Sequence, residues 1–213
     1  MDDKIYVIGG TTEGHFSGHT LVQVYDTATN TWAMVASLND GRYEAAAAVV
    51  DGKIYVFGGR WGSWGYELVT SVEVYDPADA GGGWQKVTDI PTPRLAPCAV
   101  AFGTDVFVIG GLHGGPGTGL PIYYDLIEVY HATSNTWETW DQSMTTSRVH
   151  FGAWGQGGRI YAVAGVSGVG YDHEMEVLSS LESFVVPEPA SAVLLLVGGS
   201  IVFWARRRWR RST

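Results

Sequence analysis

The residues best suited to chemistry are histidines and aromatic side chains that gather in four segments of the sequence: Thr11–His19, Arg60–Thr70, Leu112–Asp125 and Val166–Glu174. Exposed aromatic rings beside polar groups bind sugar rings or peptides, because a flat apolar face is then bordered by hydrogen-bonding groups. An alternative of equal weight is that the Trp and Tyr side chains fold back over neighbouring strands. The candidate ligand-binding residues are His15, Phe16, His19, Trp61, Trp64, Tyr66, His113, Tyr123, Tyr124, Tyr171 and His173.

Other chemistries are less well supported by the sequence. His15 and His19, with Glu13, are potential metal ligands, but a His-x-x-x-His spacing in a coil does not place both rings on one side as a helix does. The run Gly114–Gly119 matches neither phosphate-binding fingerprint and no predicted helix follows it. Cys98 lies in an apolar run and is interpreted as a small core residue. We therefore predict no metal, no cofactor and no catalytic residues.

Charge is distributed unevenly along the 213 residues. The net charge is −9, and 21 of the 22 acidic residues precede Pro187. An acidic body argues against a nucleic-acid partner, whose phosphates require a basic surface. The hydrophobic fraction of 46% indicates a globular chain with a core. Five of the 13 basic residues lie at the C-terminal end: Arg206, Arg207, Arg208, Arg210 and Arg211.

A repeat of about fifty residues organises the chain before this basic end. Each unit has an apolar run that ends in glycine, a later Val-Tyr motif, a tryptophan, and an arginine that opens the next apolar run. The apolar runs are "KIYVIGG" (Lys4–Gly10), "KIYVFGG" (Lys53–Gly59), "DVFVIGG" (Asp105–Gly111) and "RIYAVAG" (Arg159–Gly165). The later landmarks are "VQVYD" (Val22–Asp26), "VEVYD" (Val72–Asp76), "IEVYH" (Ile127–His131) and "MEVL" (Met175–Leu178), then Trp32, Trp84 and Trp137, then Arg42, Arg94 and Arg148.

Short β-branched and aromatic runs separated by turn signals, such as "VDGK" (Val50–Lys53) and "TATN" (Thr27–Asn30), predict strands throughout this region. No helical periodicity is sustained before Ala190. We expect four units, at about 1–37, 42–90, 94–142 and 148–184. Four-stranded sheets that repeat radially form a β-propeller, so the predicted fold class is all-β, with about four blades.

These landmarks, from Lys4 to about Phe184, resemble the kelch family. The resemblance implies that the double glycines and the residues Tyr25, Tyr75, Trp32, Trp84 and Trp137 are structural. It also implies that the segments after the glycines form a ligand-binding face. Some kelch enzymes are copper oxidases with a cross-linked cysteine, but Cys98 falls in a predicted core strand, so that comparison fails.

The chain departs from the kelch pattern at its two ends. The fourth unit has Ala164 in place of the first glycine, and no strand precedes "KIYVIGG" in the first unit. The N-terminal residues also lack the features of a signal peptide. We therefore expect a partial ring, or a ring closed by a terminal strand that the sequence does not identify. We also expect that the sequence is a fragment or has a different natural start, and that the chain folds poorly or associates when expressed from Met1.

The segment 190–205 is apolar and is followed directly by the arginines. As a helix its 16 residues would span about 24 Å, slightly less than a bilayer core. We expect one transmembrane helix, with the C-terminus cytoplasmic by the positive-inside rule. The preceding kelch region would then lie on the other side of the membrane.

Residues 185–213 resemble a PEP-CTERM sorting signal, in which a Pro-Glu-Pro motif, a membrane span and an Arg-rich end occur in order. The resemblance implies that Pro187, Glu188 and Pro189 are recognised by exosortase, a membrane peptidase of Gram-negative bacteria that often make exopolysaccharide. The expected localisation is export, transient anchoring in the inner membrane, and then the cell surface or outside. The expected function is binding of a glycan or a protein through the kelch loops; the alternative is an exported kelch enzyme acting on carbohydrates.

Overall fold

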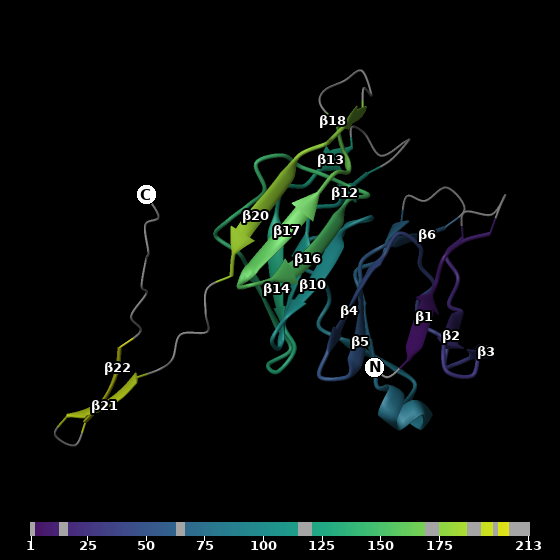
Figure 1. The fold of residues 1–213 in the computed structure, drawn as a ribbon, viewed down its shortest axis with the longest axis horizontal. Helices are drawn as coiled ribbons and strands as arrows, with labels where there is room; N and C mark the ends of the chain where they lie inside the picture. The colour runs from purple at the N-terminus through teal and green to yellow at the C-terminus, as the bar shows by residue number, and fades with distance from the viewer. Residues whose placement is uncertain are drawn as a thin grey trace.

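The computed structural model of the chain is all-β, as predicted. It describes residues 3–12, 17–62, 67–114, 121–168, 175–186, 193–197 and 200–204. Apart from the 3-10 helix η1 (Pro77–Gly82), the regular elements in these ranges are strands. They form four successive antiparallel sheets, named here sheets I to IV, which follow one another across Figure 1 from β1 to β20. No closed ring of sheets is seen within the described ranges.

Sheets II and III each contain four strands in chain order. In sheet II, Asp51 and Gly52 connect the first two strands with φ values of 48° and 77°, as a two-residue type I′ hairpin turn requires. The predicted "VDGK" turn is therefore confirmed. Sheet II consists of β4 (Ala46–Val50), β5 (Lys53–Phe57), β8 (Val72–Tyr75) and β9 (Trp84–Val87), and sheet III of β10 (Cys98–Phe102), β11 (Asp105–Ile109), β14 (Ile127–His131) and β15 (Thr136–Thr139).

Sheets I and IV have three strands each among the described residues. Sheet I consists of β1 (Lys4–Ile8), β2 (Val22–Asp26) and β3 (Thr31–Met34), and sheet IV of β16 (Gly152–Gln156), β17 (Arg159–Val163) and β20 (Leu181–Val185). In sheet I the register pairs β1 with β2 and β2 with β3, as β5, β8 and β9 pair in sheet II. Sheet I thus has, in the described part of the chain, no counterpart of the first strand β4, as the sequence indicated.

A short two-stranded hairpin is inserted between the second and third strands of sheets II, III and IV, and the three hairpins lie at the same end of the molecule in Figure 1. The assignment of "MEVL" as the fourth Val-Tyr landmark was wrong, because Met175–Val177 belongs to one of these hairpins and β20 is the strand beside β17. The hairpins are β6 (Arg60–Trp61) with β7 (Glu67–Leu68), β12 (Leu112–His113) with β13 (Ile122–Tyr123), and β18 (Val166–Gly168) with β19 (Met175–Val177).

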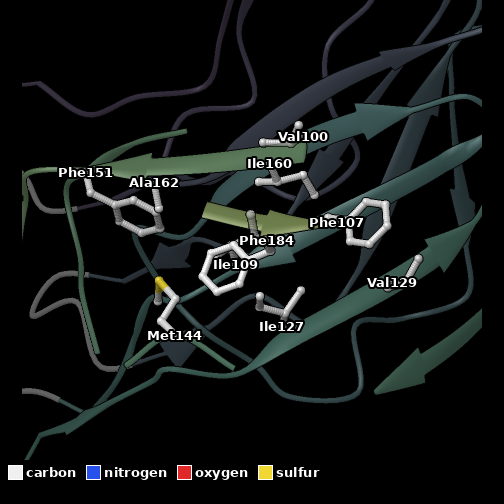
Figure 2. Packing of buried hydrophobic residues seen from close by; sticks show 10 residues of the cluster. All are labelled: Val100, Phe107, Ile109, Ile127, Val129, Met144, Phe151, Ile160, Ala162 and Phe184. Atoms are coloured by element: carbon white, nitrogen blue, oxygen red, sulfur yellow. The ribbon is translucent and has the colours of Figure 1, made fainter. Parts of the chain in front are cut away.

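Apolar side chains from facing sheets form one core between each pair of neighbours. Between sheets II and III, Tyr55 and Phe57 of β5 pack with Val106 and Val108 of β11. Figure 2 shows the corresponding cluster between sheets III and IV, in which Phe107 and Ile109 meet residues such as Ile160. The strands that precede the double glycines are therefore buried on both faces in sheets II and III, as their uninterrupted apolar character predicted.

The first glycine of each double-glycine pair lies against the backbone of the next unit. Gly58 has φ +62°, and an added Cβ would lie 2.5 Å from the carbonyl oxygen of Arg94. The amide of Gly59 donates to that same carbonyl at 2.9 Å. Gly110 contacts the carbonyl oxygen of Arg148 in the same way. Because a side chain would prevent this approach, the glycines join consecutive sheets.

The C-terminal strands differ from the predicted helix over 190–205. β21 (Val193–Val197) and β22 (Ser200–Trp204) pair as an antiparallel hairpin. In the sequence, the apolar runs Val193–Val197 and Ser200–Trp204 are separated by Gly198 and Gly199, a spacing that is also compatible with a hairpin. Among the described residues, no helix is long and apolar enough to cross a membrane.

Candidate functional site

The landmark arginines are buried and form hydrogen-bond networks inside the sheets. Arg42 is 1% exposed. Its Nη1 donates to the carbonyl oxygens of Gly58 (3.2 Å) and Ser71 (2.7 Å), and its Nη2 donates to Ser71 Oγ (2.8 Å) and to Glu73 Oε1 (2.6 Å). Glu73 is 0% exposed and also accepts from the amides of Asn39 (2.7 Å) and Asp40 (3.1 Å). Both charges are thus fully compensated.

The same network recurs in sheets III and IV. Arg94 donates to Glu128 and to the carbonyl oxygen of Gly110, and Arg148 donates to Glu182 and to the carbonyl oxygen of Ala164. Burial lowers the pKa of the Arg94 guanidinium, while Glu128 opposes that shift. The side chain of each arginine connects strands of its own sheet. Its backbone carbonyl oxygen accepts a hydrogen bond from the second glycine of the double-glycine pair in the preceding sheet. The role of these arginines is therefore structural.

Three of the five candidate residues that the structure describes lie on the short hairpins: Trp61, His113 and Tyr123. Trp61 on β6 is 51% exposed, and His113 occupies the corresponding position on β12 and is also exposed. His19 is half-buried, and its backbone connects Gly10 to Arg42. Six candidates lie outside the described residues: His15, Phe16, Trp64, Tyr66, Tyr171 and His173.

The two tyrosines after the third double glycine pack against the sheets. The Tyr123 ring lies against the backbone of Gly168, where an added Cβ would be 2.1 Å from it, and it joins an apolar cluster around Leu95. The guanidinium of Arg94 lies 5.1 Å from the centre of the Tyr124 ring. Burial raises the pKa of the Tyr124 hydroxyl. The Tyr123 and Tyr124 side chains thus fold back over the strands, which is the alternative to ligand binding that the sequence left open.

A hollow of about 410 Å³ lies beside Trp61 at the loop end of sheet II. The exposed indole contributes one apolar surface, and Thr70 is exposed. The linker between β3 and β4 contributes the polar residues Asn39 and Asp40 to the lining. The lining residues are Asn39, Asp40, Gly41, Trp61, Leu68, Val69, Thr70 and Ser71.

The polar side of this hollow is held in place by the buried arginine network. Ser71 Oγ accepts from Arg42 and donates to Asp40 Oδ2 at 2.5 Å, while Lys86 Nζ donates to Asp40 Oδ1 at 2.9 Å. Burial opposes ionisation of Asp40, but the hydrogen bonds and positive charges of Lys86, Ser71 and Arg42 outweigh it and hold the Asp40 pKa below its usual range. The hollow therefore presents a fixed anionic acceptor beside an aromatic ring.

Sequence reasoning identified Trp61 but missed Asn39, Asp40 and Thr70. Asn39 and Asp40 stand three and two positions before the landmark Arg42, in a linker without aromatic residues. A signal was present in "VEVYD", since a glutamate inside an apolar strand, 31 to 34 residues after each landmark arginine, indicates a buried pair that anchors the linker. Among the described residues, no group of three or more His, Cys, Asp or Glu is arranged to hold a metal ion.

Cys98 lies at the start of β10 and packs against the core between sheets III and IV. Its thiol donates to the carbonyl oxygen of Phe151 at 2.9 Å. Burial raises the pKa of the Cys98 thiol to about 11, so the side chain is a poor nucleophile at neutral pH.

The sheets, double glycines and inter-sheet aromatics are matched by a family model. Residues 1–183 match the KLHDC2/KLHL20/DRC7 Kelch-repeats domain. The chain therefore belongs to the kelch-repeat family, and the predicted resemblance is confirmed. Residues 185–211 match the PEP-CTERM protein-sorting motif, so this kelch-repeat protein carries a sorting motif consistent with export and with exosortase processing.

Curated relatives are longer than this chain. The chain is 30% identical over 193 residues to spermatocyte protein spe-26 of Caenorhabditis elegans, which covers 88% of the chain and 30% of that protein. It is 32% identical over 153 residues to F-box/kelch-repeat protein At1g67480 of Arabidopsis thaliana (70% of the chain, 38% of that protein), and 30% identical over 175 residues to Kelch-like protein 25 of Xenopus tropicalis (79% and 28%). The match thus spans less than two fifths of each of these three relatives.

Proposed function

We propose that this kelch-repeat protein is an exported surface or matrix protein that binds a neutral glycan in the hollow beside Trp61. The sorting motif supports export through exosortase, and the four sheets act in this proposal as blades of a propeller. The apolar segment 190–205 would anchor the chain in the inner membrane until Pro187–Pro189 is processed. The observation that carries the binding proposal is that an exposed indole and a fixed polar linker line the same hollow.

The chemistry of the hollow favours a sugar ring without charge. The Trp61 ring offers a flat apolar surface for the C–H face of a pyranose, and Asp40 and Thr70 offer acceptors for its hydroxyl groups. Asp40 stays ionised at neutral pH because its pKa is lowered, and most acidic residues of the chain lie in the same body. None of the residues that line the hollow is basic, so it offers no cation to a uronic acid or a sulfated sugar.

The test is binding of the full chain to neutral and anionic oligosaccharides. The protein is kept in a detergent without sugar groups, screened on a glycan array, and titrated calorimetrically with the best oligosaccharide. Trp61→Ala should weaken binding about 10- to 100-fold, because burying an aromatic side chain is worth roughly 1.5 to 3 kcal/mol. Asp40→Asn should weaken it less, because the amide still accepts one hydrogen bond.

The matched control is His113→Ala, which alters the same position of the hairpin in sheet III. It should leave the affinity unchanged. Equal affinities of wild type and Trp61→Ala, or binding of acidic oligosaccharides alone, would overturn the proposal.

A further inference from the structure

One face of sheet I is apolar and uncovered in the described structure. The register places Ile5, Tyr25 and Trp32 in one row across the sheet, and Val7, Gln23 and Met34 in the next. Ile5, Val7, Trp32 and Met34 are 46 to 57% exposed. The side chains of the opposite face, including Tyr6 and Ile8, pack on sheet II. We call the exposed side the leading face.

Sheet IV has an uncovered apolar face of the opposite kind. Trp154 stacks on Tyr161 with ring centres 5.1 Å apart and is 42% exposed. Leu181 and Val185 lie on the same side of β20 and are 57% and 51% exposed. The alternate residues Ile160, Ala162 and Phe184 pack on sheet III. We call the exposed side the trailing face.

The packing between sheets within this chain shows what a trailing face and a leading face contact. The trailing side of sheet II, with Tyr55 and Phe57, packs on the leading side of sheet III, with Val106, Val108 and Tyr130. The second and third strands supply these contacts, and the first strands β4 and β10 add Ala48, Val50, Ala99 and Ala101. Sheet IV contains all three of these strands, and sheet I contains the second and third. Each internal interface joins a trailing face to a leading face, never two faces of the same kind.

We propose that two copies of this 213-residue chain associate head to tail, with the trailing face of one copy packed on the leading face of the other. The contact continues the arrangement by which sheet II meets sheet III. The strand positions on the two faces carry no acidic residue, so the acidic character of the body does not oppose the contact. Two copies would bring eight sheets together, the upper end of the usual range of propellers, and both contacts form at once if the pair closes.

The first part of the test measures the mass of the full chain in detergent by light scattering with the detergent contribution subtracted. Wild type should show twice the 23.0 kDa chain mass at micromolar concentration. Trp32→Glu on the leading face and Leu181→Glu on the trailing face should each weaken association about 30-fold or more, as expected for a charge placed among central interface residues. Both side chains are exposed in one copy, so each variant should keep its circular dichroism spectrum.

The second part distinguishes a head-to-tail contact from contact between like faces or through the apolar tail. In a mixture, Leu181→Glu still has an intact leading face and Trp32→Glu an intact trailing face. The two variants should therefore form mixed dimers, detected by native mass spectrometry with one partner isotope-labelled. Association through like faces predicts that one of the variants still self-associates, and association through the tail predicts that both do.

The control is Ile122→Glu, which places the same charge at a 54% exposed position on β13, away from both faces. It should leave the dimer unchanged. A monomeric wild type, dimers that persist in both face variants, or variants that fail to form mixed dimers would each overturn the proposal.

Discussion

Sheets I and II carry nearly the same side chains at the same positions of their leading faces, yet only those of sheet II are covered. Ile54, Val56 and Trp84 are 3%, 1% and 4% exposed, whereas their counterparts Ile5, Val7 and Trp32 are 55%, 46% and 57% exposed. The Tyr and Trp rings lie close in both sheets, with centres 5.2 Å apart for Tyr75 and Trp84 and 5.0 Å apart for Tyr25 and Trp32. The repeat therefore fixes the arrangement within a sheet, and the neighbouring sheet fixes how much stability it provides.

The two sheets also differ at one polar position. Glu73, which is fully buried and bonded to Arg42, corresponds to Gln23 in sheet I, which is exposed. A buried carboxylate requires a cation beside it, and an exposed amide does not. The comparison predicts that substitutions at equivalent positions have unequal effects.

The largest effect is expected from breaking a buried pair. Arg94→Ala leaves Glu128 buried without its cation and removes the donor to the Gly110 carbonyl oxygen. It should lower the free energy of unfolding by about 3 to 5 kcal/mol, measured by urea denaturation followed by tryptophan fluorescence. Gln23→Ala changes the position of sheet I that corresponds to Glu128 and is exposed, so it should cost less than about 0.5 kcal/mol. Similar losses for both variants would contradict the structural role of the network.

A smaller effect is expected at the tryptophans. Trp84→Phe creates a small cavity and leaves the carbonyl oxygen of Ala36 without the indole donor that now lies 2.8 Å away. It should lower the free energy of unfolding by about 2 kcal/mol, and Trp32→Phe by less than about 0.5 kcal/mol. Both are measured at a protein concentration at which the chain is monomeric. Equal costs would show that the leading face of sheet I is covered in the monomer.

The elements that sequence predicted well are those set by local chemistry. The turn at Asp51 and Gly52 and the close approach of Gly58 depend on backbone conformations that few residues adopt, so the residue types alone indicate them. The packing roles of Tyr75 and Trp84 followed from the repeat. Their equivalents Tyr25 and Trp32 occupy the same strand positions, but their exposure depends on a neighbouring sheet that the repeat pattern does not reveal.

The elements that sequence missed depend on contacts between distant residues. Glu182 in "LESFV" is the partner of Arg148, but the sequence of "MEVL" resembles the other landmarks more closely. Asp40 becomes part of a hollow only because Ser71 and Lys86, 31 and 46 residues further on, bond to it. At the C-terminal end, the segment that apolar length predicted as a helix contains the paired strands β21 and β22 in the described residues, so the helix is not confirmed.

The smallest effect concerns the pH dependence of stability at Glu182, which occupies in sheet IV the position of Gln23 in sheet I. Burial disfavours its carboxylate, but hydrogen bonds from the Thr145 hydroxyl and amide, together with Arg148, outweigh burial and hold the Glu182 pKa below its usual range. Because the folded-state pKa is the lower one, the ionised group stabilises the fold above the unfolded pKa of about 4.3. That contribution is lost as the pH falls through the folded-state pKa.

Urea denaturation between pH 6 and pH 3.5 tests this dependence. Thr145→Ala removes the hydroxyl donor at 2.6 Å, so it should raise the Glu182 pKa in the folded state and reduce the stability lost on acidification. Gln23→Glu places a carboxylate at the equivalent exposed position, where no arginine is paired with it in the described structure, and should add no acid-sensitive stability. Two outcomes would contradict this origin of the acid sensitivity: Thr145→Ala loses as much stability as wild type over this pH range, or Gln23→Glu loses more than wild type. Either would show that the acid sensitivity does not come from the position that Glu182 occupies in sheet IV and Gln23 in sheet I.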